Sequence, residues 1–361
     1  MQRTGSKAPV EFSNLWEGEN AQQMYAKNNG FIEDHMYGDP LVVAKADDFI
    51  YKLSKSPVTG KPFIVGELNQ AEGAKNVAAQ SATRSMLPLA AAAYGSLQNW
   101  SGLVFFAWTH GDKVIGSDGW AEQEKRESDI GHMVSDGMQL DHLRTCGMIF
   151  RRGLVDRSVT PVTMHVDDPI IVGDYNGLMR GKYAFKAGWQ DIHQVRKSYG
   201  PVPADQATAP WMTQTPANPL VSDTKQISKD LDRRQLTVAA PKAEAFSGYL
   251  DGGAPAALKH LELSGDGFAT VVMVADDNVE LAGSMHLIIS RTNINAANGE
   301  TEGPVIHLAG LKAPGPGQHW QFRPTRPRDL AEVQKDQEMK TENGQIVLPG
   351  GGWHECELEP K

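Results

Sequence analysis

The chain has 361 residues, a net charge of −9 and a pI near 5.7. This acidic balance argues against a nucleic-acid-binding protein, which would present a basic face. Hydrophobic residues make up 40 % of the chain, and no apolar run reaches the roughly eighteen residues of a membrane span, so we expect a soluble protein of two domains. Two cysteines, Cys146 and Cys356, are too few for a disulfide framework.

The N-terminal stretch Met1–Lys7 lacks the apolar core of a signal peptide. We expect a bacterial protein and leave its compartment unknown.

The first half of the chain alternates between short apolar runs and helical patterns. The segment Phe31–Tyr37 is typical of a strand that ends in polar and aromatic groups, and 41–53 has helical spacing. The run Phe63–Val65 predicts a short buried strand that leads through Gly66 to the carboxylate of Glu67. Such a carboxylate is typical of a catalytic rim at the ends of parallel strands, although it could also cap a following helix.

Residues 72–97 have an alanine-rich helical pattern interrupted by Pro88, which predicts a kink or two helices that meet near Leu87. The run 103–108 predicts another buried strand, and 138–151 predicts a helix. This alternation is the signature of a parallel sheet. Each of its three strands ends in His, Tyr, Glu or Trp, so we expect these side chains to form one rim of one pocket.

Two segments, Lys61–Glu67 and Pro88–Trp108, together resemble the last strands of retaining glycoside hydrolases with a β/α barrel, the clan of cellulases, xylanases and β-galactosidases. Leu143–Gly153 resembles the helix that closes such a barrel before a C-terminal β-sandwich. The resemblance implies that Glu67 is the nucleophile and that Trp108 is a platform for a sugar ring.

The other candidate substrate-binding residues lie at the expected rim: His35, Tyr37, Asn69 and His110. The two histidines could equally be structural residues with satisfied hydrogen bonds. The implied substrate is a β-linked polysaccharide, glucan or xylan, cleaved within its chain.

The chain departs from this family in two respects. A complete barrel has eight strands, whereas about three precede the sandwich here. The family's acid/base glutamate follows an asparagine, and no Asn-Glu pair occurs in the sequence. We therefore consider Glu33 or Asp34 for that role, of which strand alternation lets only one face the pocket. A partner copy or a missing N-terminal segment could also complete the barrel and supply the acid.

From Val159 onward the pattern changes to short alternating strands, the first at 159–166. A helix is possible at 183–197, and the proline-rich stretch 200–221 predicts an extended surface connection. Further strands are expected at 226–228, 235–239, 245–250, 258–263, 268–274, 285–291, 305–308 and 345–348. This spacing predicts an antiparallel β-sandwich.

The predicted fold is therefore α/β plus all-β. It combines a partial TIM-barrel-like β/α domain at 1–157 with a β-sandwich at 158–361 that carries the proline-rich insertion. We expect that no cofactor is required, and the sequence does not decide whether an incidental divalent metal ion binds. The expected partner is a polysaccharide or oligosaccharide, with neither nucleic acid nor membrane, and a homo-oligomer is possible. The rival hypotheses are a non-catalytic carbohydrate-binding or structural fragment of a larger hydrolase, and an unrelated β/α protein whose Glu67 caps a helix.

Overall fold

The computed structural model describes most of the chain, with gaps. The described residues are 30–38, 49–69, 83–107, 137–167, 185–253, 255–295, 299–300, 304–327, 335–339, 341–342 and 344–361, together with Ala8, Pro9, Gln23, Ala26 and Lys27.

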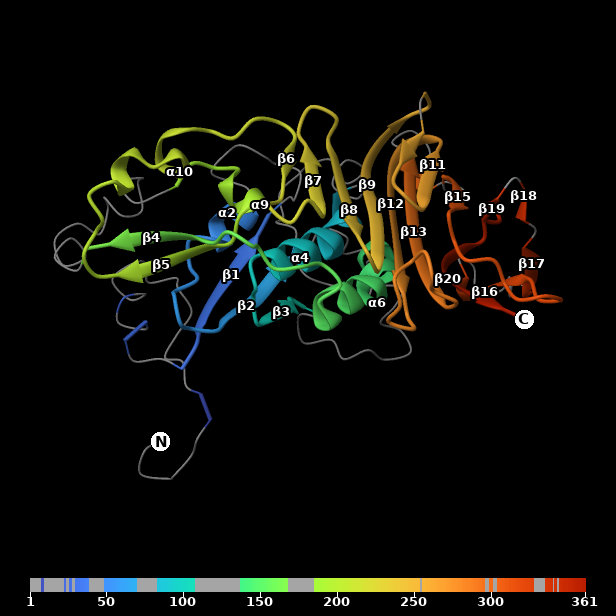
Figure 1. Ribbon diagram of the computed structural model, residues 1–361, viewed down its shortest axis with the longest axis horizontal. Coiled ribbons are helices and arrows are strands. Elements are labelled where there is room, and N and C mark those ends of the chain that lie inside the picture. Colours follow the sequence, from blue (N-terminus) through green and yellow to red (C-terminus); the bar gives the residue numbers. More distant parts are fainter. Residues whose placement is uncertain are drawn as a thin grey trace, which may run out of the picture.

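Three parallel strands form the sheet that carries Glu67. They are β1 (Ile32–Tyr37), β2 (Phe63–Asn69) and β3 (Gly102–Phe105), in the order β1-β2-β3. The helices α2 (Phe49–Leu53) and α4 (Met86–Leu97) lie in the connections between them (Figure 1). The predicted β/α alternation is thus confirmed here. The sheet is open, however, and no closed barrel is formed by the part of the chain that the structure describes.

Helix α4 is buried along its whole length, because it is covered on more than one side. Its alanine-rich sequence has helix propensity and gives small side chains that let neighbouring elements approach closely. The predicted helix break lies at Ser85, just before α4 begins. Pro88 therefore occupies the first turn of the helix, where its missing N–H removes no intrahelical hydrogen bond.

Helix α6 (Gly137–Arg152) packs beside α4 and joins it to a large antiparallel sheet (Figure 1). The join is partly polar. The ring nitrogens of His142 lie 2.8 Å from the hydroxyls of Ser290 and Thr292, and Thr145 Oγ1 lies 2.8 Å from Ser290 Oγ. The guanidinium of Arg144 bonds Glu355 at 2.7 Å and Glu357 at 2.9 Å. These contacts fix α6 on the sheet.

The large sheet has ten described strands. Its main path runs in the order β17 (Gln337–Met339), β16 (Trp320–Pro327), β20 (Trp353–Pro360), β13 (Leu287–Asn295), β12 (Asp266–Ala275), β9 (Ala243–Asp251), β8 (Gln235–Ala240), β7 (Ile227–Asp230) and β6 (Leu220–Val221), and β14 (Gly299–Glu300) pairs with β13.

A smaller antiparallel sheet covers the face of the large sheet that lies away from the helices. It comprises β10 (Ala256–Ala257), β11 (Leu261–Ser264), β15 (Val305–Ala309), β19 (Gln345–Val347) and β18 (Thr341–Glu342). Strand β12 shows how the layers share their cores. Val272 and Val274 belong to the core that includes α4, whereas Val271 and Met273 belong to the core between the two sheets. The sandwich-like character predicted for this half is present.

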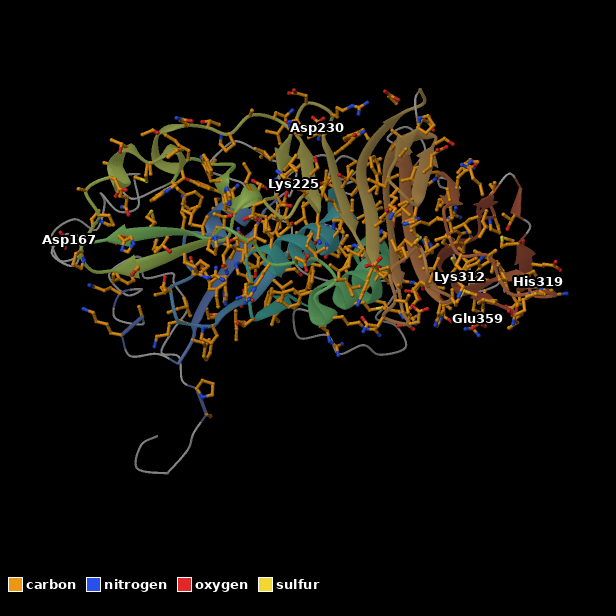
Figure 2. All side chains as sticks on the ribbon, in the orientation of Figure 1. Asp167, Lys225, Asp230, Lys312, His319 and Glu359 are labelled. Carbon is orange, nitrogen blue, oxygen red and sulfur yellow. The ribbon has the colours of Figure 1, made fainter. Side chains whose placement is uncertain are left out.

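A fourth, two-stranded sheet pairs β4 (Val162–Val166) in parallel with β5 (Val195–Tyr199). The molecule is elongated: Asp167, just after β4, and His319, just before β16, lie toward opposite ends of its long axis (Figure 2). None of the helices in the described part of the chain has the length and apolar character needed to span a bilayer.

The remaining segments correct two of the expectations. The described part of 183–197 holds only the one-turn helix α9 (Trp189–Ile192) before β5 begins, so the predicted longer helix is wrong. Strands β16 and β20 were not predicted. The proline-rich stretch is a largely exposed connection, as expected. It also contains two short turns of helix that were not predicted, η5 (Gln206–Thr208) and α10 (Pro210–Thr213). The core around α4 includes residues on both sides of the predicted domain boundary at 157. This boundary between two domains stays a prediction.

Candidate functional site

A β-bulge at Gly66 sets the direction of Glu67. Asp34 pairs with Val65 and His35 pairs with Glu67, so Gly66 is an additional residue in β2. The residues before the bulge, Phe63 and Val65, alternate into the core. The bulge shifts the alternation by one position and brings the carboxylate of Glu67 to the same face as the side chain of His35.

Four side chains on this face are connected. The phenol of Tyr37 donates to Glu67 Oε2 at 2.5 Å. The same oxygen lies 3.2 Å from His35 Nδ1, and the other ring nitrogen, Nε2, lies 2.5 Å from Glu33 Oε1. No group in the described residues contacts the second carboxylate oxygen of Glu67, whose side chain is 29 % exposed. One oxygen is therefore held, while the other has no hydrogen bond or ion pair to the described residues.

The phenol of Tyr37 is held in its protonated form. Burial, and then the hydrogen bond and charge of Glu67, raise the pKa of Tyr37 above its usual value. Its ring also meets the edge of Phe106, with centroids 6.4 Å apart and planes at 89°. The tyrosine is thus a fixed donor to the carboxylate and cannot act as a proton acceptor near neutral pH.

Asp34 lies on the opposite face of β1 from Glu67. Its Oδ2 accepts a 2.5 Å hydrogen bond from Ser56 Oγ, and its Oδ1 accepts a 2.8 Å bond from the backbone N–H of His35. Burial raises the pKa of Asp34 to about 6, against the opposing effect of the Ser56 hydrogen bond. As expected from strand alternation, only Glu33 of the two neighbouring acids shares a face with Glu67.

Gly66 provides the space that the Glu33 carboxylate occupies. A Cβ atom at Gly66 would lie 1.6 Å from Glu33 Oε1 and 2.5 Å from its Cδ, so any other residue would displace this carboxylate. The sequence predicted only that the strand ends at Gly66. A glycine between an apolar run and a glutamate is nevertheless a known signal for a bulge or a close approach.

Asn69 has a structural position at the end of β2. It is buried, its Nδ2 donates to the carbonyl of Phe106 at 2.8 Å, and its Oδ1 accepts from Gln139 Nε2 at 2.9 Å. These bonds tie β2 to the end of β3 and to α6. Phe106 and Gln139 were not among the predicted site residues, because only the fold brings them to Asn69.

The structure brings together Glu67, Glu33, His35 and Tyr37 from the predicted site. Trp108 and His110 lie outside the described residues, and their predicted roles stay predictions. No group of three or more His, Cys, Asp or Glu side chains that could hold a metal ion occurs in the described part of the chain.

Comparison of the chain with models of protein families, with curated proteins and with solved structures finds no match in any of the three.

Proposed function

We propose that the chain is a retaining glycoside hydrolase that cleaves β-linked polysaccharide, glucan or xylan, within the chain, with Glu67 as its nucleophile. The observation that carries the proposal is the way Glu67 is held. One oxygen receives the phenol of Tyr37 and faces His35, and the other has no partner in the described residues. A carboxylate that is oriented through one oxygen can attack through the other.

The proposed reaction has two steps. Glu67 attacks the anomeric carbon, the glycosidic C–O bond breaks, and the leaving oxygen takes a proton from a general acid. Water then attacks the glycosyl ester, returns a proton to the same group and releases the free sugar and the Glu67 carboxylate. The Tyr37 phenol holds the carboxylate in the geometry that the first step needs.

The proposed mechanism also needs a general acid. A retaining mechanism needs two carboxyl groups about 5–5.5 Å apart, with the scissile bond between them. Asp34 faces away from Glu67, and the imidazole of His35 occupies the space between Glu33 and Glu67. This geometry favours an acid from outside the described residues or from a partner chain over Glu33 or Asp34.

The proposal is tested by assaying the chain on soluble β-glucan and xylan beside Glu67→Gln, which keeps the shape and removes the negative charge. Glu262→Gln is a matched control, because Glu262 lies on β11 in the small sheet. We expect the Glu67 variant to lose at least about 10³-fold in kcat and the control to match the parent. Equal activity in the Glu67 variant and the parent would exclude Glu67 as the nucleophile.

The second candidate, a non-catalytic carbohydrate-binding or structural fragment, is favoured by one observation. The three described parallel strands form an open sheet on which no second carboxylate faces Glu67 directly. Its signature would be no hydrolysis by the parent, together with saturable binding of the same glucan or xylan in a calorimetric titration.

A further inference from the structure

The imidazole of His35 has an acidic partner at each ring nitrogen. Nε2 lies 2.5 Å from Glu33 Oε1, and Nδ1 lies 3.2 Å from Glu67 Oε2. A neutral imidazole has one N–H donor, whereas the imidazolium has two. Only the imidazolium can donate to a carboxylate at each end of the ring.

We propose that Glu33 is a positioning residue: its carboxylate holds the His35 ring as an imidazolium, and the ring then donates to Glu67. Glu33 acts through His35 and does not itself meet the substrate. The side chains of Glu33 and His35 are only 15 % and 13 % exposed, so their charges are poorly screened by water and the pair is a strong one.

Two other polar groups near the ring in the described part of the chain have different partners. The carboxyl group of Asp34 contacts the backbone N–H of His35 and the Ser56 hydroxyl, on the other face of β1. The Tyr37 phenol is neutral and bonds Glu67. The ring is therefore flanked by Glu33 on β1 and by Glu67 on β2.

Gly66 gives a second, independent way to disturb Glu33. Because a Cβ at this position would overlap the Glu33 carboxylate, Gly66→Ala displaces the carboxylate without changing the number of charges. Glu33→Gln does the reverse: it keeps the shape and removes the charge. If the Glu33 carboxylate keeps the His35 ring doubly protonated, both variants should leave the ring with one protonated nitrogen.

The experiment is ¹⁵N NMR of the His35 side chain at neutral pH in the full chain, compared with Glu33→Gln, Gly66→Ala and the control Glu262→Gln. We expect two protonated ring nitrogens in the parent and the control, and one in both test variants. A neutral His35 ring in the parent, or an unchanged imidazolium in the two test variants, would overturn the proposal. Far-UV circular dichroism and the remaining histidine signals verify that each variant is folded.

The kinetic consequence rests on the proposed function, whereas the NMR result does not. If Glu67 is the nucleophile, Glu33→Gln should lower kcat at neutral pH at least about tenfold, with KM nearly unchanged. The loss should shrink as the pH is lowered and the ring becomes protonated without Glu33. A merely structural role would give no such recovery. If the parent is inactive but its His35 imidazolium depends on Glu33, the proposed hydrolase activity is wrong. The proposed role of Glu33 in holding His35 then still stands.

Discussion

Tyr37 ends β1 and Glu67 lies near the end of the neighbouring parallel strand β2, and the phenol of the first donates a 2.5 Å hydrogen bond to Oε2 of the second. A bond of this length between a hydroxyl and a carboxylate is typical of a charge-assisted interaction. It restrains the carboxylate rotamer and leaves the other oxygen without a partner in the described residues. The pair is the most direct structural support for Glu67 as a reacting group.

Removal of the Tyr37 hydroxyl should therefore impair turnover more than substrate binding. We expect Tyr37→Phe to lower kcat about 10- to 100-fold, which corresponds to the roughly 1.5–3 kcal/mol of a hydrogen bond to a charged group. Steady-state kinetics on β-glucan or xylan measures the effect, and Tyr249→Phe, on β9, is the matched control. A kcat unchanged by Tyr37→Phe would show that this hydrogen bond has no role in catalysis.

Asp34 should make the protein less stable as the pH rises. Burial raises the pKa of Asp34 from 3.8 to about 6, so between these values the native state binds more protons than the unfolded state. The free energy of unfolding should fall across this window by roughly 3 kcal/mol. Urea unfolding at a series of pH values measures the pH dependence, and Asp34→Asn should remove the contribution of Asp34 to it. A pH dependence of stability that is the same in the parent and in Asp34→Asn would contradict this role of Asp34.

His142 should have the opposite effect on stability. Burial lowers the pKa of His142 from 6.5 to about 4, although the charge of Asp141 favours the protonated ring. The unfolded state therefore binds more protons in this window, and stability should fall as the pH is lowered through it, by roughly 3 kcal/mol in total. His142→Gln keeps polar groups for Ser290 and Thr292 and should remove the contribution of His142 to the pH dependence.

The two effects overlap between pH 4 and 6, so their contributions should nearly cancel in the parent. Asp34→Asn should then expose a slope that rises with pH, and His142→Gln a slope that falls. Parallel slopes in the two variants would contradict this assignment.

Lys229 and Asp191 form a buried ion pair, and their effects on stability should be strongly coupled. Lys229 Nζ lies 2.9 Å from Asp191 Oδ1, and the two side chains are 2 % and 0 % exposed. Removal of one partner leaves a buried charge, so Lys229→Met or Asp191→Leu alone should destabilise the protein by about 3–5 kcal/mol. The double variant should lose much less than the sum. Additive losses in denaturant unfolding would show that the pair is not coupled.

The sequence predicted local elements well where hydrophobic periodicity was clear. Strands β1 and β2, helix α6 and five of the ten described strands of the large sheet, β7, β8, β9, β12 and β13, follow from it. Strand β16 was missed because Pro324 and Pro327 argue against a strand interior, and its pairing with β20 is indeed irregular there. Strand β20 carries several charged residues, and its burial depends on partners such as Arg144 that only the fold supplies.

At the site, the sequence indicated Glu67, His35 and Tyr37 as neighbours because parallel strands end at one edge of a sheet. It could not indicate that a bulge at Gly66 would reset the alternation, or that the imidazole would lie between Glu33 and Glu67. Such details depend on the register of strands that are about thirty residues apart in sequence, which no local pattern encodes.

The most direct test of the central claim is to trap the covalent intermediate. The chain is incubated with a 2-deoxy-2-fluoro glycoside of glucose or xylose that carries a good leaving group, and is then digested and analysed by mass spectrometry. The account predicts a fluoroglycosyl adduct on the peptide that contains Glu67, absent from Glu67→Gln. Hydrolysis of the glycoside by the parent with the adduct on a different carboxylate would contradict the assignment of Glu67 as the nucleophile.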